Sequence, residues 1–75
     1  MNKSEKNELI FEVSRPPEND GWYIAETYGS DFFIVTEAKS LEELKSKVID
    51  AIECQFDGEL KPFKLITKEK EIILL

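Results

Sequence analysis

The sequence predicts an α+β domain, a two-layer sandwich in which one helix packs against an antiparallel sheet in the order β-β-β-α-β-β. Three observations lead to this prediction. An apolar stripe with helical spacing runs through residues 40–56, segments with the alternation of strands precede and follow it, and the 75 residues suffice for one small core.

The first two strands are expected at residues 8–14 and 22–28. Successive side chains in a strand point to opposite faces, so the apolar residues of the first segment would share one face. These residues are Leu9, Phe11 and Val13. Between the two segments, residues 15–21 contain two prolines and end in Asp-Gly, which is typical of a turn in a meander.

A third strand is expected at residues 32–36, and it is apolar on both faces. One face would pack against the helix. The other would face a second subunit, or solvent at some cost, because an exposed apolar strand favours aggregation. We therefore take this segment as the candidate interaction surface. Its residues are Phe32, Phe33, Ile34, Val35 and Thr36.

The helix is predicted over residues 40–56. Ser40 followed by Glu43 matches a capping box, in which the serine side chain accepts the backbone N–H of the glutamate. Apolar residues then recur at spacings of three and four, which places them on one face. The stripe consists of Leu41, Leu44, Val48, Ala51, Ile52 and the pair Gln55–Phe56. Gly58 is expected to end the helix in a left-handed conformation, and Pro62 prevents it from resuming.

Two further strands are expected at residues 63–67 and 71–75, joined as a terminal hairpin by Lys68-Glu69-Lys70. Residues 1–7 are polar and charged, and we expect them to form a flexible tail. The predicted organisation is therefore a tail over residues 1–7 and a single domain over residues 8–75.

The composition argues against several kinds of site. The chain has no histidine and one cysteine, so we expect neither a metal site nor an internal disulfide. We expect Cys54 to act as a small packing residue near the helix end rather than as a reactive thiol. Since no apolar run reaches the length of a membrane span and no signal-peptide core is present, we expect a cytoplasmic protein.

The charge balance indicates the kind of partner. Ten basic and sixteen acidic residues give a formal net charge of −6. Phosphate backbones are bound mainly by lysine and arginine, so direct binding of nucleic acid is not expected. An acidic domain suits a basic partner, because opposite charges speed encounter. The simpler alternative is that the charge serves solubility alone.

We expect no enzyme activity, no cofactor and no catalytic residues. Histidine is the usual general base, and without it the common serine and cysteine triads are excluded. Paired carboxylates are the remaining candidates, since Glu12 and Glu26 would lie on neighbouring strands and Glu42 and Glu43 are adjacent. With sixteen acidic residues, such pairs arise by chance.

Residues 36–44 resemble HicB-like antitoxin domains, in which a strand and a short turn lead into Ser/Thr-Leu-Glu-Glu-Leu at the start of a helix. This chain has Thr-Glu-Ala-Lys-Ser-Leu-Glu-Glu-Leu there, and the similarity covers residues 8–75. It is strongest to a short stand-alone branch, in which a histidine commonly stands where this chain has Gln55. The further matching residues are Gly21-Trp22-Tyr23, Ala51, Cys54, Phe56-Asp57 and Pro62.

The resemblance implies a β-β-β-α-β core related to the double-stranded-RNA-binding fold, usually as a homodimer. HicB proteins neutralise HicA, a small basic ribonuclease toxin. Most of them carry a C-terminal DNA-binding domain, which we expect this chain to lack. Some short relatives are labelled as subunits of 2-oxoisovalerate dehydrogenase, but an enzyme subunit that binds thiamine diphosphate needs a much longer chain.

Together these features favour a non-enzymatic protein-interaction module, an antitoxin-like domain that neutralises a small basic HicA-like toxin. The alternative is an orphan homodimer with a structural or regulatory role. The apolar third strand is the feature that favours the homodimer, since a second copy would cover it.

Overall fold

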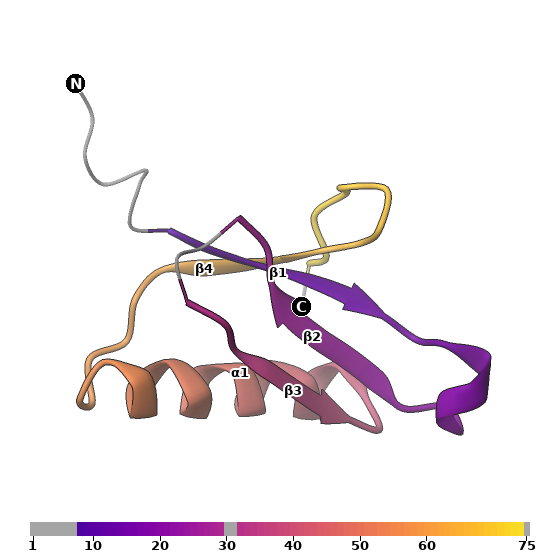
Figure 1. The fold of residues 1–75 in the computed structure, drawn as a ribbon, viewed down its shortest axis with the longest axis horizontal. Coiled ribbons are helices and arrows are strands. Elements are labelled where there is room, and N and C mark those ends of the chain that lie inside the picture. The colour runs from indigo at the N-terminus through magenta and orange to yellow at the C-terminus, as the bar shows by residue number, and fades with distance from the viewer. Residues whose placement is uncertain (1–7, 30–31, 75) are drawn as a thin grey trace.

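The elements follow one another in the order β1-β2-β3-α1-β4 (Figure 1). The computed structural model describes residues 8–29 and 32–74, so the tail expected at residues 1–7 lies outside the described residues. The strands are β1 (Leu9–Ser14), β2 (Tyr23–Thr27), β3 (Val35–Ala38) and β4 (Phe63–Ile66); the helix is α1 (Leu41–Gln55), and a short 3-10 helix, η2 (Pro17–Asn19), follows β1. The predicted α+β class is confirmed.

The sheet is mixed, with the strand order β3-β2-β1-β4. β2 pairs antiparallel with both β1 and β3, whereas β4 pairs parallel with β1. The expectation of a purely antiparallel sheet is therefore wrong. A single helix between two strands reverses the chain direction once more, so β4 has to run in the same direction as β3, and β3 runs in the same direction as β1.

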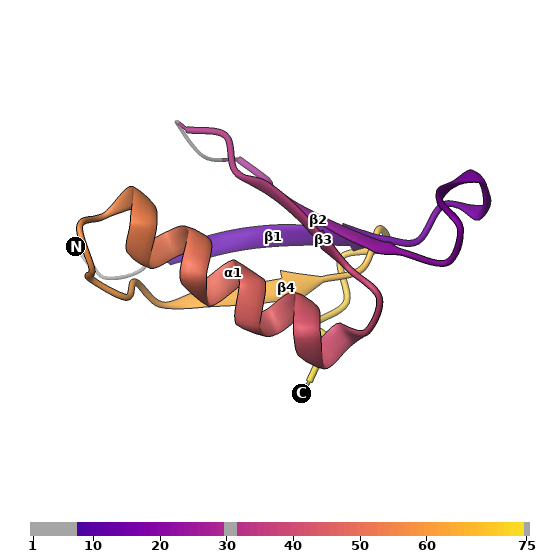
Figure 2. The same cartoon turned by 90° about the horizontal axis from the view of Figure 1, so that it is seen from below.

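The core lies between α1 and one face of the sheet (Figure 2). The predicted face of β1 is buried, and the register places Ala25 of β2 and Leu65 of β4 on the same side. Each large apolar side chain buried here contributes roughly 1.5–3 kcal/mol. The side chains that are fully buried are Phe11, Leu44, Val48 and Ile52.

The start of α1 follows the prediction. The Ser40 side chain accepts the backbone N–H of Glu43 at 3.1 Å. The Glu43 carboxylate accepts the N–H of Lys39 at 3.4 Å, one residue earlier than the box predicts. The bond to Ser40 satisfies a backbone donor that the first turn of a helix cannot pair internally, and the bond from Lys39 ties the residue before the cap to the same turn.

The end of α1 differs from the prediction in which side chains it buries. Gln55 and Cys54 are both exposed, so the packing role expected for Cys54 is wrong. Cys54 lies only two residues after the buried Ile52, and a helix turns that position away from the core. Asp57 and Gly58 are both left-handed, with φ values of 58° and 88°, and they end the helix where predicted.

α1 contains 15 residues, whereas a membrane-spanning helix needs about 20 apolar ones. Among residues 8–29 and 32–74, no helix is long and apolar enough to cross a bilayer.

The third strand begins at Val35 rather than at Phe32. Thr27, at the end of β2, accounts for this difference. Its Oγ1 accepts the N–H of Ile34 at 3.1 Å, and its hydroxyl donates to the carbonyl of Phe32 at 3.1 Å. The Thr27 side chain thus bonds backbone groups of Phe32 and Ile34 that would otherwise pair with β2, so regular pairing starts only at Val35.

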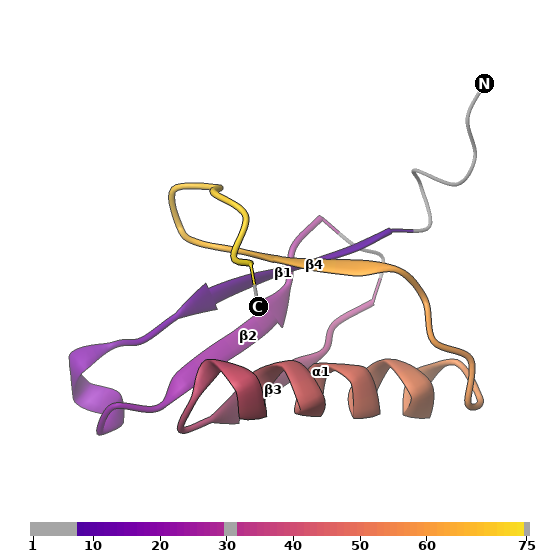
Figure 3. The same cartoon turned by 180° about the vertical axis from the view of Figure 1, so that it is seen from behind.

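The strand expected at residues 71–75 is reduced to one antiparallel bridge between Ile66 and Ile72, and Leu75 lies outside the described residues. Figure 3 shows this segment rising above the sheet and returning toward β4. The Thr67 hydroxyl oxygen accepts the N–H groups of Glu69 and Glu71 at 3.2 and 3.1 Å, which closes a wide turn. The N–H of Thr67 also donates to the carbonyl of Glu71, and that of Ile73 donates to the carbonyl of Leu65, both at 2.8 Å. The chain therefore turns back at residues 68–70 as predicted, but the returning segment pairs too briefly to form a regular strand.

The cap of α1 gives a first prediction. Replacing Ser40 with alanine removes the acceptor of the Glu43 N–H, so we expect Ser40→Ala to lower the free energy of unfolding by about 1 kcal/mol. Ser46→Ala is the matched control, because Ser46 is exposed within the same helix, where alanine is the better helix former. Urea denaturation followed by circular dichroism measures both. Equal stability of the two variants would contradict the cap.

Candidate interaction surface

The segment predicted as the interaction surface, residues 32–36, is divided between the core and the surface. Phe32 packs against the core, with its ring edge-on to that of Phe56 and the two ring centroids 5.3 Å apart. Ile34 is buried within the core. These two residues attach the segment to the core, so their own side chains are largely unavailable to a partner.

Of the other three residues of the segment, two face solvent and one faces the helix side of the sheet. Phe33 is 74% exposed, and Val35 is 45% exposed. Thr36 is half-buried and pairs with Ala25, so its side chain lies on the helix side of the sheet. Of the five predicted residues, only Phe33 and Val35 present apolar side chains to solvent.

The hydrogen bonds of β2 define which backbone groups of β3 are free. The N–H of Tyr28 donates to the carbonyl oxygen of Ile10, in β1, at 2.8 Å. The N–H of Thr27 donates to Ile34, just before β3, at 3.0 Å. Alternate residues of an antiparallel strand bond to opposite neighbours, so the odd-numbered residues of β2 pair with β3.

The same alternation leaves one side of β3 unpaired. Thr36 and Ala38 face the odd-numbered residues of β2, so the N–H and C=O groups of Val35 and Glu37 point away from the sheet. We refer to these four backbone groups as the outer β3 edge. Such an edge is a template on which another strand can pair.

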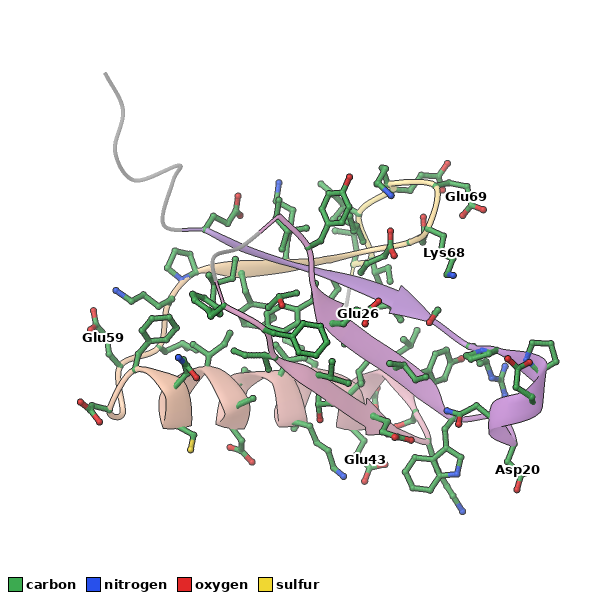
Figure 4. The ribbon with its side chains drawn as sticks, in the orientation of Figure 1. Asp20, Glu26, Glu43, Glu59, Lys68 and Glu69 are labelled. Atoms are coloured by element: carbon green, nitrogen blue, oxygen red, sulfur yellow. The ribbon has the colours of Figure 1, made fainter. Side chains whose placement is uncertain are left out.

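The side of the sheet that faces away from α1 is referred to here as the outer sheet face. The register assigns its residues, because partners in adjacent strands lie on the same side. Figure 4 shows Glu26 on this side, with Glu43 on the helix side. The residues of the outer sheet face are Ile10, Glu12, Ser14, Ile24, Glu26, Val35, Glu37, Lys64 and Ile66.

The β4 half of this face is covered by the segment that follows β4. Ile66 is only 6% exposed although it points away from the core. Ile72 bridges to it, and Lys70 lies over the ring of Tyr28, 4.6 Å from the ring centroid. The half that β2 and β3 form lacks such a cover among the described residues.

The cations of the outer sheet face are paired on its covered half. Lys70 Nζ lies 2.8 Å from Glu12 Oε2, and Lys64 Nζ lies 3.5 Å from Glu8 Oε1. Glu26 and Glu37 are exposed, and neither forms an ion pair with another described residue. The open half therefore combines unpaired carboxylates with Val35 and the half-buried Ile24.

The pair of Glu12 and Lys70 shifts the pKa of both groups. The hydrogen bond from Lys70 holds the pKa of Glu12 below its ordinary value of 4.5, with smaller help from the charges of Lys70 and Lys68. The hydrogen bond to Glu12 raises the pKa of Lys70 above 10.5. The Lys70 ammonium group is thus paired with Glu12 of β1 and does not pair with Glu26 of β2.

The carboxylate pair considered from the sequence does come together. Glu12 and Glu26 are direct partners in the ladder between β1 and β2. A general acid at neutral pH needs a raised pKa, whereas that of Glu12 is lowered. Glu42 and Glu43 lie in the first turn of α1, where Glu43 serves the cap. Among residues 8–29 and 32–74, no group of three metal-ligating side chains forms.

Glu37 and Tyr28 are surface residues that the sequence did not single out, and Glu26 was considered only as part of a carboxylate pair with Glu12. Tyr28 is 46% exposed beside the covered half. Side chains alternate along a strand, so Glu26 and Tyr28 share one face of the second strand, but the register decides which face lies against the helix. Glu37 required the correct position of β3, because the predicted strand ended before it.

The ion pair gives a second prediction. Because the pKa of Glu12 is lower in the folded chain than its ordinary value of 4.5, the stabilisation from the pair is fully present above that pH. This contribution disappears as the pH falls through the folded pKa. We expect Lys70→Met to raise the pKa of Glu12, measured by NMR titration of its carboxyl carbon.

Lys61→Met is the control for this titration, because Lys61 pairs with Glu59 rather than with Glu12. It removes the same charge from the chain and should leave the pKa of Glu12 unchanged. A Glu12 pKa that is the same with and without Lys70 would show that the pair does not form in solution.

Comparison with known proteins identifies a relative. Over 54 residues the chain is 47% identical to the UPF0150 protein of Archaeoglobus fulgidus, and the aligned region covers 72% of this chain and 74% of the relative. No protein-family model matches the chain, and no solved structure matches it.

Proposed function

The chain belongs to the UPF0150 family, and we propose that it is a non-enzymatic protein-interaction module that binds a small basic protein. The observation that carries this proposal is the open half of the outer sheet face. There the exposed Val35 lies opposite Glu26 across the strands, and Glu37 lies opposite Ile24. Apolar area supplies affinity, and unpaired carboxylates select a positively charged partner.

We propose further that the partner is a HicA-like toxin and that the chain acts as a HicB-like antitoxin domain in the cytoplasm. Two features support this part of the proposal. β3 leads through a short turn into the Ser40 cap and α1, as the sequence similarity implies, and the order β-β-β-α-β agrees with it. The net charge of −6 suits a small basic ribonuclease.

The test is co-expression with a small basic HicA-like toxin, with growth and co-purification as readouts. We expect the chain to restore growth and to purify with the toxin. We expect the double variant Glu26→Lys and Glu37→Lys to weaken binding on the order of a hundredfold, because like charges across an interface cost several kcal/mol.

The matched control reverses two exposed charges on α1, Glu42→Lys and Asp50→Lys. Both double variants change the net charge equally, so only the position of the charges differs between them. If the parent chain neither binds the toxin nor restores growth, the proposed function is wrong. Equal effects of the two double variants would show that the outer sheet face is not the binding surface.

The alternative proposal is a homodimer with a structural or regulatory role. The exposed side chains of Phe33 and Val35 beside the outer β3 edge support it, since a second copy would cover them. Sedimentation velocity at micromolar concentration distinguishes the two proposals. A dimer that persists when the toxin is added favours the alternative, and a monomer removes it.

A further inference from the structure

Two edges of the sheet are available for pairing, and they differ. The outer edge of β4 is occupied in part by the segment after it, because Ile73 donates its N–H to the carbonyl of Leu65 at 2.8 Å and Ile72 bridges to Ile66. The outer β3 edge has no such neighbour among the described residues. A strand can therefore join this sheet at β3 without displacing anything described.

β3 has only some of the features that usually block pairing at an edge. Natural edges are protected by proline, lysine or a bulge. Residues 35–38 read Val-Thr-Glu-Ala and pair with β2 in an unbroken register, so none of these three devices is present. β3 is short, at four residues, and it carries the charge of Glu37, which disfavours an added acidic strand but not a basic one. Lys39, the nearest cation, lies over the ring of Trp22, 5.3 Å from its centroid, and is held at the end of the strand.

We infer that the partner binds by adding an extended basic strand to the outer β3 edge, an inference that rests on the proposed function. Val35 and Glu37 each offer one N–H and one C=O to the incoming strand, which gives affinity through main-chain hydrogen bonds. The side chains of the same two residues lie on the outer sheet face, which gives specificity.

The side chains of β3 specify the chemistry of the added strand. Val35 and Glu37 are two residues apart on one face, so the strand needs an apolar residue and a basic residue at the same spacing. Its alternate side chains would lie beside Thr36 and Ala38, where small residues fit. Repeated Val-Thr-Lys-Thr is the simplest sequence that meets these requirements.

Charge favours this occupant over a second copy of the chain. A second copy would bring another net charge of −6 to the same edge, together with a second set of unpaired carboxylates from Glu26 and Glu37. A basic strand neutralises those carboxylates instead. Opposite charges on facing strands stabilise the pair, and like charges destabilise it.

The experiment uses the full chain, labelled with ¹⁵N, and a synthetic peptide of repeated Val-Thr-Lys-Thr. A peptide with glutamate in place of lysine is the control. With the basic peptide at about ten times its dissociation constant, we expect the amide protons of Val35 and Glu37 to exchange about tenfold more slowly, because only the free chain exposes them. The acidic peptide should leave them unchanged.

A pair of variants isolates the main-chain contribution. Glu37→Ala removes the carboxylate alone, whereas Glu37→Pro also removes the outward N–H, which takes no part in the ladder with β2. We expect the proline variant to bind the basic peptide roughly three- to tenfold more weakly than the alanine variant, the effect of one net hydrogen bond. If the proline variant does not fold, the exchange rates of Val35 and Glu37 in the parent chain still test whether the peptide pairs with this edge.

With the peptides, three results overturn the inference: no binding of the basic peptide, equal binding of both peptides, or binding without slower exchange at Val35 and Glu37. Protection of these amides in the free chain that grows with its own concentration also overturns it, in favour of a second copy. Rescue of growth by the chain without protection of this edge would refute the inference alone. Failure of the rescue would refute the proposed function and leave the peptide result standing.

Discussion

One helix of 15 residues covers a sheet of four strands, and it can cover only one face. Leu44, Val48 and Ile52 meet the inner face, where they are fully buried with Phe11 of the central strand. The outer face needs other cover. On one half, Lys70 of the segment after β4 lies against Glu12 and Tyr28, while Ile72 pairs beside Ile66 at the edge of β4. The remaining half, beside β3, is where the structure leaves apolar side chains and unpaired carboxylates together.

The direction of the chain determines which edge stays open. Because α1 carries the chain from β3 back across the sheet, β4 arrives beside β1 and parallel to it. β3 is thereby left at the far edge, with nothing after it in the described chain to pair with. The open edge and the open half of the outer face adjoin, so a single partner can use both. This coincidence favours an interaction module over a catalytic domain.

Local sequence predicted the parts of the fold that depend on local interactions. Ser40 and the spacing of Leu44, Val48 and Ile52 defined the helix and its buried face, and alternation in β1 defined the inner face of the sheet. The start of β3 depends on the Thr27 side chain, which takes backbone groups seven residues ahead of it. β4 pairs parallel with β1 because the helix reverses the chain direction between β3 and β4. Strand propensity identifies strands but does not give their direction. The exposed positions of Glu26 and Glu37 could be assigned only from the strand register, because alternation alone does not say which face the helix covers.

Amide hydrogen exchange in the free chain tests the central claim, an unpaired outer β3 edge, most directly. The account predicts alternation along this strand: the amides of Thr36 and Ala38 are protected by pairing with β2, and those of Val35 and Glu37 exchange nearly as fast as in an unstructured peptide. The measurement is made by NMR at low protein concentration, where a second copy does not bind. Protection of all four amides under these conditions would show that the edge is already paired and would contradict the account.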